Sequence, residues 1–320
     1  MWREIGLLGE RREVGVAEMT IAAYADHSNA KWEVSITEAP HGKRWHTSFH
    51  ASRFPGSNPL SCDREAMYEL LAIPPAKAAP PFLVAISDAG KDIENQIVYR
   101  WLRSGKLVSA APGSKVQTGF EDPEHWLTCS LDAALDMRDS GWPHVHPVDI
   151  KGKDHMVVES MISGKKGPEE GHIRQVMVQI HFCRMFHEKM GWDKIGLQPA
   201  KGGSLLYVSR ARPMTMQEFY IEYDEEVMRV GLERLKKRQL DFMQGTLPPR
   251  DKTWSWAQDP WPCRWCNFKK QCKADVRAGI DKLRDSHAVA HAAAVNPNYK
   301  FDAVYDAVFD RWNPLVKGTP

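Results

Sequence analysis

Apolar positions repeat at two different spacings along this chain, and the spacings predict a succession of helices and strands. From Phe82 to about Leu102, Ile86, Ile93 and Ile97 recur at helical intervals, and Gly105 is expected to end this helix. By the same criteria we expect helices at 63–71, 168–190, 224–243 and beyond 275, and strands at 125–132, 144–151, 204–210 and 218–223. This order predicts a mixed α/β core.

Composition places limits on the class of protein. The chain has 320 residues, of which 42% are hydrophobic and 26% charged, enough for one large domain or two small ones. The formal net charge of +2 gives no global argument for a polyanionic partner. No apolar run approaches the roughly 18 residues of a membrane span. The N-terminus carries charges where a secretory signal needs an apolar core, so we expect a cytoplasmic protein that does not enter membranes.

Four of the six cysteines form a candidate metal-ligand set. Cys263, Cys266 and Cys272 follow a C-x2-C-x5-C spacing that lets three thiolates converge on one metal or cluster, with the distant Cys62 as the candidate fourth ligand. In the reducing compartment expected here, such cysteines are better interpreted as ligands than as disulfides. The spacing differs from the two-knuckle zinc pattern and favours an iron–sulfur cluster, with a four-thiolate zinc site as the alternative.

A pair of acidic residues is the candidate catalytic site. Asp132 ends one expected strand, and the next strand ends in Asp149, Ile150 and Lys151. Because residues i and i+2 of a strand share a face, Asp149 and Lys151 should point the same way while Ile150 points into the core. A hairpin of the two strands would bring Asp132 alongside Asp149. Two carboxylates and an ammonium on one face suit Mg²⁺ or Mn²⁺ and a phosphate substrate; an ordinary solvated strand end is the alternative.

Other residues have simpler interpretations. We expect Cys129 and Cys183 to be small buried apolar residues, and His144 and His146 to be polar residues at a strand edge, with metal ligation as the alternative. Tryptophans gather just before and within the cysteine segment, where they either shield a buried metal site or stack on nucleic-acid bases; they are Trp254, Trp256, Trp261 and Trp265.

Six short motifs, in the same order along the chain, resemble the PD-(D/E)XK nuclease superfamily and in particular its iron–sulfur branch, which includes RecB/AddB-type and CRISPR-associated RecB-like exonucleases. The motifs are Ser61-Cys-Asp-Arg-Glu-Ala-Met-Tyr68, Gly90-Lys-Asp-Ile-Glu94, Asp132, Asp149-Ile-Lys151, Gln175-Val-Met-Val-Gln179, and the three late cysteines after Pro248-Pro249. Glu94 stands where the family has histidine, and Gln179 where it has tyrosine.

The resemblance implies a restriction-endonuclease-like fold, with a mixed β-sheet flanked by helices and closed by a cysteine-ligated cluster subdomain. It implies that Glu94, Asp132, Asp149 and the carbonyl of Ile150 hold Mg²⁺ or Mn²⁺, and that Lys151 and Gln175 complete the catalytic set. Cys62, Cys263, Cys266 and Cys272 would bind a [4Fe–4S] cluster. Further phosphate contacts, with solvated charges as the alternative, would come from Arg64, Arg174, Lys165 and Lys166.

The implied activity is a metal-dependent DNA exonuclease that acts on single-stranded ends in replication, recombination or repair. A non-catalytic nucleic-acid-binding protein that retains the fold, and a related endonuclease, are the alternatives. The expected organisation is a small N-terminal addition at 1–50, a nuclease core at 51–275 and a helical tail at 276–320.

Overall fold

The chain forms two compact units, each assembled from separate stretches of sequence. The computed structural model describes residues 49–50, 62–73, 81–108, 119–211, 215–249, 263, 266 and 268–312. The first unit comprises the described parts of Pro81–Gly119 and Ser130–Tyr223. The second comprises those of Ser35–Pro80, Phe120–Cys129 and Asp224–Pro320. The predicted organisation into 1–50, 51–275 and 276–320 stays a prediction.

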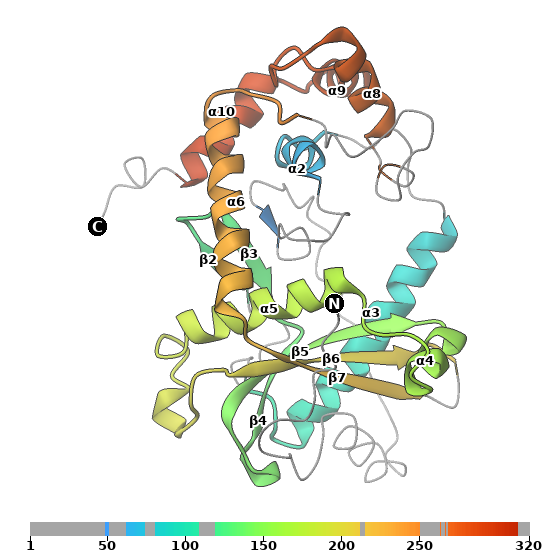
Figure 1. The fold of residues 1–320 in the computed structure, drawn as a ribbon, viewed down its shortest axis with the longest axis vertical. Helices are drawn as coiled ribbons and strands as arrows, with labels where there is room; N and C mark the ends of the chain where they lie inside the picture. Colours follow the sequence, from blue (N-terminus) through green and yellow to red (C-terminus); the bar gives the residue numbers. More distant parts are fainter. Residues whose placement is uncertain are drawn as a thin grey trace. The chain divides into compact units, whose positions relative to one another are not determined.

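A mixed four-stranded sheet is the centre of the first unit (Figure 1). Its strands lie in the order β4 (Ala133–Met137), β5 (Trp142–Lys153), β6 (Gly202–Ser209) and β7 (Met216–Glu222). The β5–β6 pair is parallel, and the β4–β5 and β6–β7 pairs are antiparallel. A parallel pair needs a long crossover, which here contains α4 (His155–Ile162) and α5 (Glu170–Met185). Every residue of β6 is buried, as expected for an inner strand covered on both faces.

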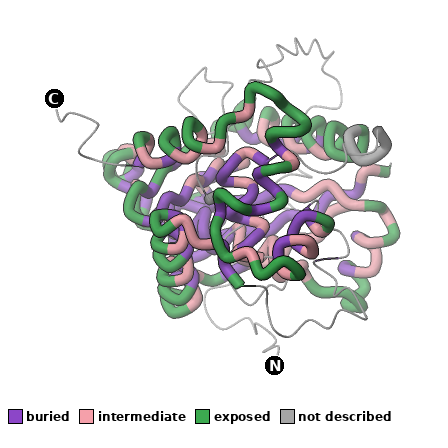
Figure 2. The backbone as a smooth tube through the Cα atoms, turned by 90° about the horizontal axis from the view of Figure 1, so that it is seen from above, coloured by how far each residue is buried: buried purple, intermediate pink, exposed green. Residues whose placement is uncertain are grey.

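Two helices cover opposite faces of this sheet. Helix α3 (Pro81–Arg103) places Ile93, Ile97 and Trp101 in one apolar core with Val148 and Ile150 of β5. Helix α5 packs on β5 and β6 and contacts the alternate residues of β5, which point to the other face. In Figure 2, exposed and buried residues alternate along the helices, as expected for helices that have one face against a core.

The second unit is mainly helical. Its helices are α2 (Asp63–Leu70), α6 (Glu225–Met243), α8 (Lys269–Ala278), α9 (His287–Val295) and α10 (Phe301–Trp312). A small three-stranded sheet has the order β1 (Phe49–His50), β3 (Leu127–Ser130) and β2 (Gly119–Asp122). Short 3₁₀ helices, η2 (Arg138–Ser140) and η3 (Asp193–Ile195), belong to the first unit.

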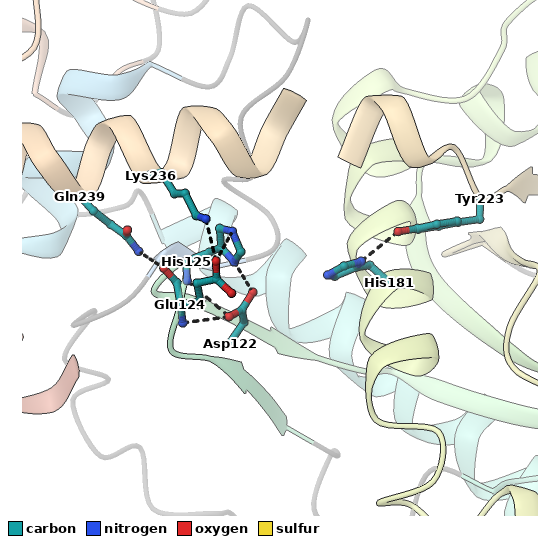
Figure 3. A network of polar contacts seen from close by, with 7 residues as sticks. All are labelled: Asp122, Glu124, His125, His181, Tyr223, Lys236 and Gln239. Carbon is teal, nitrogen blue, oxygen red and sulfur yellow. Dashed lines mark hydrogen bonds and ion pairs between the residues drawn. The ribbon is translucent and has the colours of Figure 1, made fainter. Parts of the chain in front are cut away.

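The turn between β2 and β3 is held by polar side chains of this second unit (Figure 3). Asp122 accepts a hydrogen bond from the backbone N–H of Glu124 at 3.0 Å, and its other oxygen lies 2.6 Å from the His125 ring. From α6, Lys236 binds the Glu124 carboxylate and Gln239 donates to the Glu124 carbonyl. The same figure shows His181 of α5 hydrogen-bonded to the Tyr223 hydroxyl, a contact within the first unit.

The periodicity correctly predicted the long helices and most of the strands. Helix α3 ends at Arg103, followed by Gly105 in the left-handed region at φ +71°, as expected. The prediction of one strand at 125–132 was wrong. Only 127–130 is extended there, and the antiparallel partner of β5 is β4, a short apolar run that begins just after Asp132. Helix α4 was not predicted, because its eight residues are too few to display a helical repeat.

The mixed α/β architecture with a sheet flanked by helices is therefore confirmed in the first unit. Within the described residues, no helix combines the length and the apolar character needed to cross a membrane.

Candidate active site

Strand β5 presents Asp149 and Lys151 on the face that α5 covers. Their neighbour Ile150 points to the opposite face and packs in the α3 core, as the two-residue period predicts. The Asp149 side chain has no exposed surface, and its two oxygens lie 3.0 and 2.8 Å from the Lys151 ammonium. A buried carboxylate is stable only with such a partner, so the strand itself creates a fixed ion pair.

Asp132 lies beside Asp149, at the point where the chain enters β4. The β4–β5 register pairs Ala133 with Val148, so the next antiparallel position places Asp132 opposite Asp149. The Asp132 carboxylate accepts a hydrogen bond from the Ile150 N–H at 2.9 Å. The predicted neighbourhood of the two aspartates is therefore correct, although a different strand of the sheet provides it.

Glu94 of α3 adds a third negative charge to this neighbourhood. Burial raises the pKa of Asp132 well above its usual range, and the charges of Asp149 and Glu94 raise it further. Burial also raises the pKa of Asp149, although Lys151 opposes this effect. Burial disfavours the charged form of Lys151, but the surrounding carboxylates outweigh it and raise its pKa. The site thus concentrates more negative charge than its one ammonium neutralises.

Gln179 of α5 is the glutamine that contacts this group. Its amide donates to Asp149 Oδ1 at 3.1 Å and to the Ser130 carbonyl at 3.5 Å, and the residue is fully buried. Gln175, which the motif resemblance assigned to the site, lies one turn earlier on α5 and is half-buried. The sequence signal that could have identified Gln179 is its position in an otherwise apolar helical face, between Val176 and Cys183.

The donor set suits a hard divalent cation in its chemistry. Asp149 Oδ2 is buried, and its described contact is the ion pair with the Lys151 ammonium at 2.8 Å, which leaves this oxygen a lone pair for a cation. Carboxylate and carbonyl oxygens are the ligands that Mg²⁺ and Mn²⁺ prefer. Within the described ranges, however, no three histidine, cysteine or acidic side chains are arranged as a ready metal-binding group. The carboxylates are instead held by Lys151, Gln179 and the Ile150 N–H.

In the second unit, the four candidate ligand cysteines line one small pocket. Cys62, Cys263, Cys266 and Cys272 share its wall with Tyr68 and several other side chains. None of the four forms a disulfide bond among the described residues. Burial raises the pKa of Cys62 and that of Cys266, and Glu65 and the thiols of Cys62 and Cys263 also raise the pKa of Cys266. Within the described residues these side chains do not form a ready metal-binding group, so a metal or cluster shared by the four cysteines stays a prediction.

The remaining candidates have structural roles or lie outside the described residues. Cys129 and Cys183 are buried, as predicted. His146 is also fully buried and shares a hydrogen bond with Ser204, so the prediction of a strand-edge residue was wrong, because β5 is an inner strand. His144 shares a hydrogen bond with the Pro199 carbonyl. The tryptophans of the cysteine segment lie outside the described residues; they are Trp254, Trp256, Trp261 and Trp265.

Three of the four basic residues proposed for phosphate contact are engaged with protein groups. Arg64 is buried and donates to the Pro248 carbonyl at 2.9 Å, so the prediction of a phosphate contact there was wrong. Arg174 is partly buried and donates to Glu170 of the same helix at 3.0 Å. Lys166 lies 3.8 Å from Glu169, and Lys165 is exposed.

Comparison with known proteins finds distant likenesses among solved structures. No protein-family model matches the sequence, and the search of curated proteins finds no relative. The chain is similar to an alkaline exonuclease from Laribacter hongkongensis, at 11% identity and a TM-score of 0.38, over 62% of this chain and 88% of that one. The same exonuclease in complex with dAMP is 12% identical with a TM-score of 0.39, over 62% of this chain and 92% of that one. The protein SSO0001 is 17% identical with a TM-score of 0.36, over 80% of this chain and 94% of that one. Likeness at this level carries no conclusion about activity.

Proposed function

We propose that this protein is a metal-dependent nuclease that hydrolyses phosphodiester bonds in DNA. The observation that carries the proposal is the set of three carboxylates and one lysine in the first unit. Asp149 and Lys151 come from β5, Asp132 from the start of β4 and Glu94 from α3, and their charges act on one another. A buried group of this kind destabilises the fold, so its presence favours a functional role.

The residues that would hold Mg²⁺ or Mn²⁺ are Glu94, Asp132, Asp149 and the carbonyl of Ile150. When bound, the cation would polarise the scissile phosphate and lower the pKa of a coordinated water. Burial, and after it the charges of Asp149 and Glu94, raise the pKa of Asp132, and a divalent cation would offset both effects by favouring the ionised carboxylates.

The protein's own groups would orient the reactants. Lys151 would position the attacking water, or donate to the negative charge that develops on the phosphate oxygens. Gln179 would keep the Asp149 carboxylate in one orientation through its amide. Gln175, on the same helix one turn earlier, is proposed to contact the substrate strand.

Two finer parts of the proposal come from the motif resemblance. The first is exonuclease action on single-stranded DNA ends. The second is a [4Fe–4S] cluster, held by Cys62, Cys263, Cys266 and Cys272, that stabilises the second unit. The shared pocket of these cysteines supports a common metal centre and is compatible with four-thiolate zinc as well.

A cleavage assay on matched substrates tests the proposal. Purified protein is incubated with end-labelled linear and closed circular single-stranded DNA, in Mn²⁺ or in EDTA. The expected result is metal-dependent release of short products from linear DNA, with circles left intact. Cleavage of circles would refute exonuclease action in favour of an endonuclease. DNA binding without cleavage under any divalent metal would refute the enzymatic proposal in favour of a non-catalytic nucleic-acid-binding protein.

A further inference from the structure

A second polar cluster lies on the same face of β5, one step beyond the candidate active site. Because alternate residues of a strand share a face, Lys153 follows Asp149 and Lys151 at intervals of about 6.6 Å. Its ammonium lies 2.7 Å from Glu169 Oε1. Lys166 lies 3.8 Å from the same oxygen, and His172 Nε2 lies 3.6 Å from Glu169 Oε2. One carboxylate is therefore surrounded by three nitrogen groups, and we call these four residues the Glu169 cluster.

The buried Tyr207 of β6 fixes the geometry of this cluster. Its hydroxyl oxygen accepts a hydrogen bond from the Glu169 backbone N–H at 2.9 Å and lies 2.9 Å from His172 Nδ1. We assign the imidazole proton to Nε2, because the hydroxyl oxygen already accepts from this N–H and its hydrogen can be donated to Nδ1. The histidine then presents a donor towards the Glu169 carboxylate, on the same side as the two lysines.

The cluster retains excess positive potential although it contains Glu169. Burial lowers the pKa of His172 to about 3, and the charges of Lys151 and Lys153 lower it further, against the opposing effect of Glu169. The Glu169 side chain is 39% exposed, whereas the side chains of Lys153 and His172 are 25% and 22% exposed. Lys153 and His172 are thus more enclosed than the carboxylate, whereas the Lys166 side chain, at 45%, is the most exposed of the four.

We propose that the Glu169 cluster is a phosphate-binding subsite for the DNA strand next to the scissile bond, and that Glu169 is its internal counter-ion. A backbone phosphate would displace the Glu169 carboxylate and take over its contacts with Lys153, Lys166 and His172 Nε2. A phosphate has the same charge sign and accepting oxygens as the carboxylate, so each donor would keep a partner. This inference rests on the proposed nuclease function and adds a site for the non-reacting part of the substrate.

Opposite effects are expected from removing the counter-ion and from removing a donor. Glu169→Gln should tighten binding of a single-stranded oligonucleotide about fivefold at low salt, because the phosphate no longer competes with a carboxylate. Lys153→Gln should weaken binding about fivefold. It should also reduce the slope of log affinity against log salt concentration by about 1, as expected for the loss of one phosphate contact. Both changes keep the Glu169 backbone N–H that binds Tyr207, so the fold of the cluster should persist.

The test is fluorescence anisotropy with a labelled single-stranded oligonucleotide in EDTA, over a range of NaCl concentrations. Glu188→Gln and Lys194→Gln are matched charge controls on exposed positions of the same unit. The inference is supported if Glu169→Gln binds more tightly than Glu188→Gln and Lys153→Gln binds more weakly than Lys194→Gln. It is overturned if either variant equals its control, or if the wild type does not bind. Should Glu169→Gln fail to fold, His172→Gln replaces it, with weaker binding expected.

Cleavage is measured on the same preparations with Mn²⁺. If the two variants show the expected changes in affinity but the wild type does not cleave DNA, the subsite is supported and the nuclease proposal is refuted. If the wild type cleaves DNA but both variants bind like their controls, the nuclease proposal is supported and the subsite is refuted.

Discussion

Replacing Gln179 by leucine tests whether α5 orients the Asp149 carboxylate, which is proposed to be catalytic. The change removes the amide that donates to Asp149 Oδ1 at 3.1 Å and leaves the two contacts of Lys151 in place. A hydrogen bond to a charged group contributes about 1.5–3 kcal/mol. Because Lys151 still holds Asp149, we take the lower end, and about 1.5 kcal/mol corresponds to roughly a tenfold fall in kcat.

The effect on folding should be smaller than the effect on turnover. Gln179 Oε1 is buried without a hydrogen bond, so leucine also removes an unsatisfied acceptor. We expect the free energy of unfolding to fall by less than about 1 kcal/mol, because removal of the unsatisfied acceptor offsets part of the lost hydrogen bond to Asp149. The substrate KM should stay nearly unchanged, because Gln179 has no exposed surface from which to contact DNA.

The assay is steady-state release of nucleotides from end-labelled DNA, with urea unfolding of the same preparations. Gln239→Leu is the matched control, because Gln239 is a buried glutamine of the second unit with one amide hydrogen bond, to the Glu124 carbonyl at 3.0 Å. Gln175→Leu tests the residue that the motif resemblance placed in the site. The orienting role of Gln179 would be refuted by wild-type kcat in Gln179→Leu, or by an equal loss in Gln239→Leu.

Three further predictions concern stability and the cysteine centre. Burial holds His172 neutral with a pKa of about 3, below its unfolded value of about 6.5. The free energy of unfolding should therefore decrease as the pH falls from about 6.5 towards 3, because the unfolded state binds the proton first. In His172→Gln, urea unfolding should show a smaller decrease in this free energy from about pH 7 to about pH 5 than in the wild type. Asp63→Asn should lower the unfolding free energy by about 3 kcal/mol, because Arg238 is buried and pairs with it; an unchanged urea midpoint would contradict this. Anaerobically purified protein should contain iron and sulfide, and Cys272→Ser should lose both; zinc alone would exclude the iron–sulfur assignment.

Local rules were sufficient for the parts of the site that lie on one strand. The two-residue period of β5 correctly placed Asp149 and Lys151 together and Ile150 in the core. The proximity of Asp132 also followed from an antiparallel pairing, although β4 forms it. Such predictions succeed because they depend on backbone geometry that neighbouring residues share.

Contacts between separate elements were beyond sequence reasoning. The bond from Gln179 to Asp149 depends on how α5 is rotated against β5, and the Tyr207–His172 bond depends on the parallel register of β5 and β6. Neither the rotation nor the register can be read from a single apolar pattern. The motif comparison pointed to α5 and gave Gln175 a catalytic role, which stays a prediction, while the structure places Gln179 against the carboxylate.

The most direct test of the central claim is single-turnover cleavage of linear single-stranded DNA by Asp149→Asn beside the wild type, in saturating Mn²⁺. The substitution keeps the size of the side chain and removes the charge that Lys151 pairs with and that is proposed to hold the cation. Asp139→Asn, at an exposed aspartate paired with Lys106, is the control. We predict that Asp149→Asn loses at least about a hundredfold in rate, in the range that loss of a key electrostatic group produces, while Asp139→Asn retains full activity. Cleavage by Asp149→Asn at the wild-type rate would contradict the account.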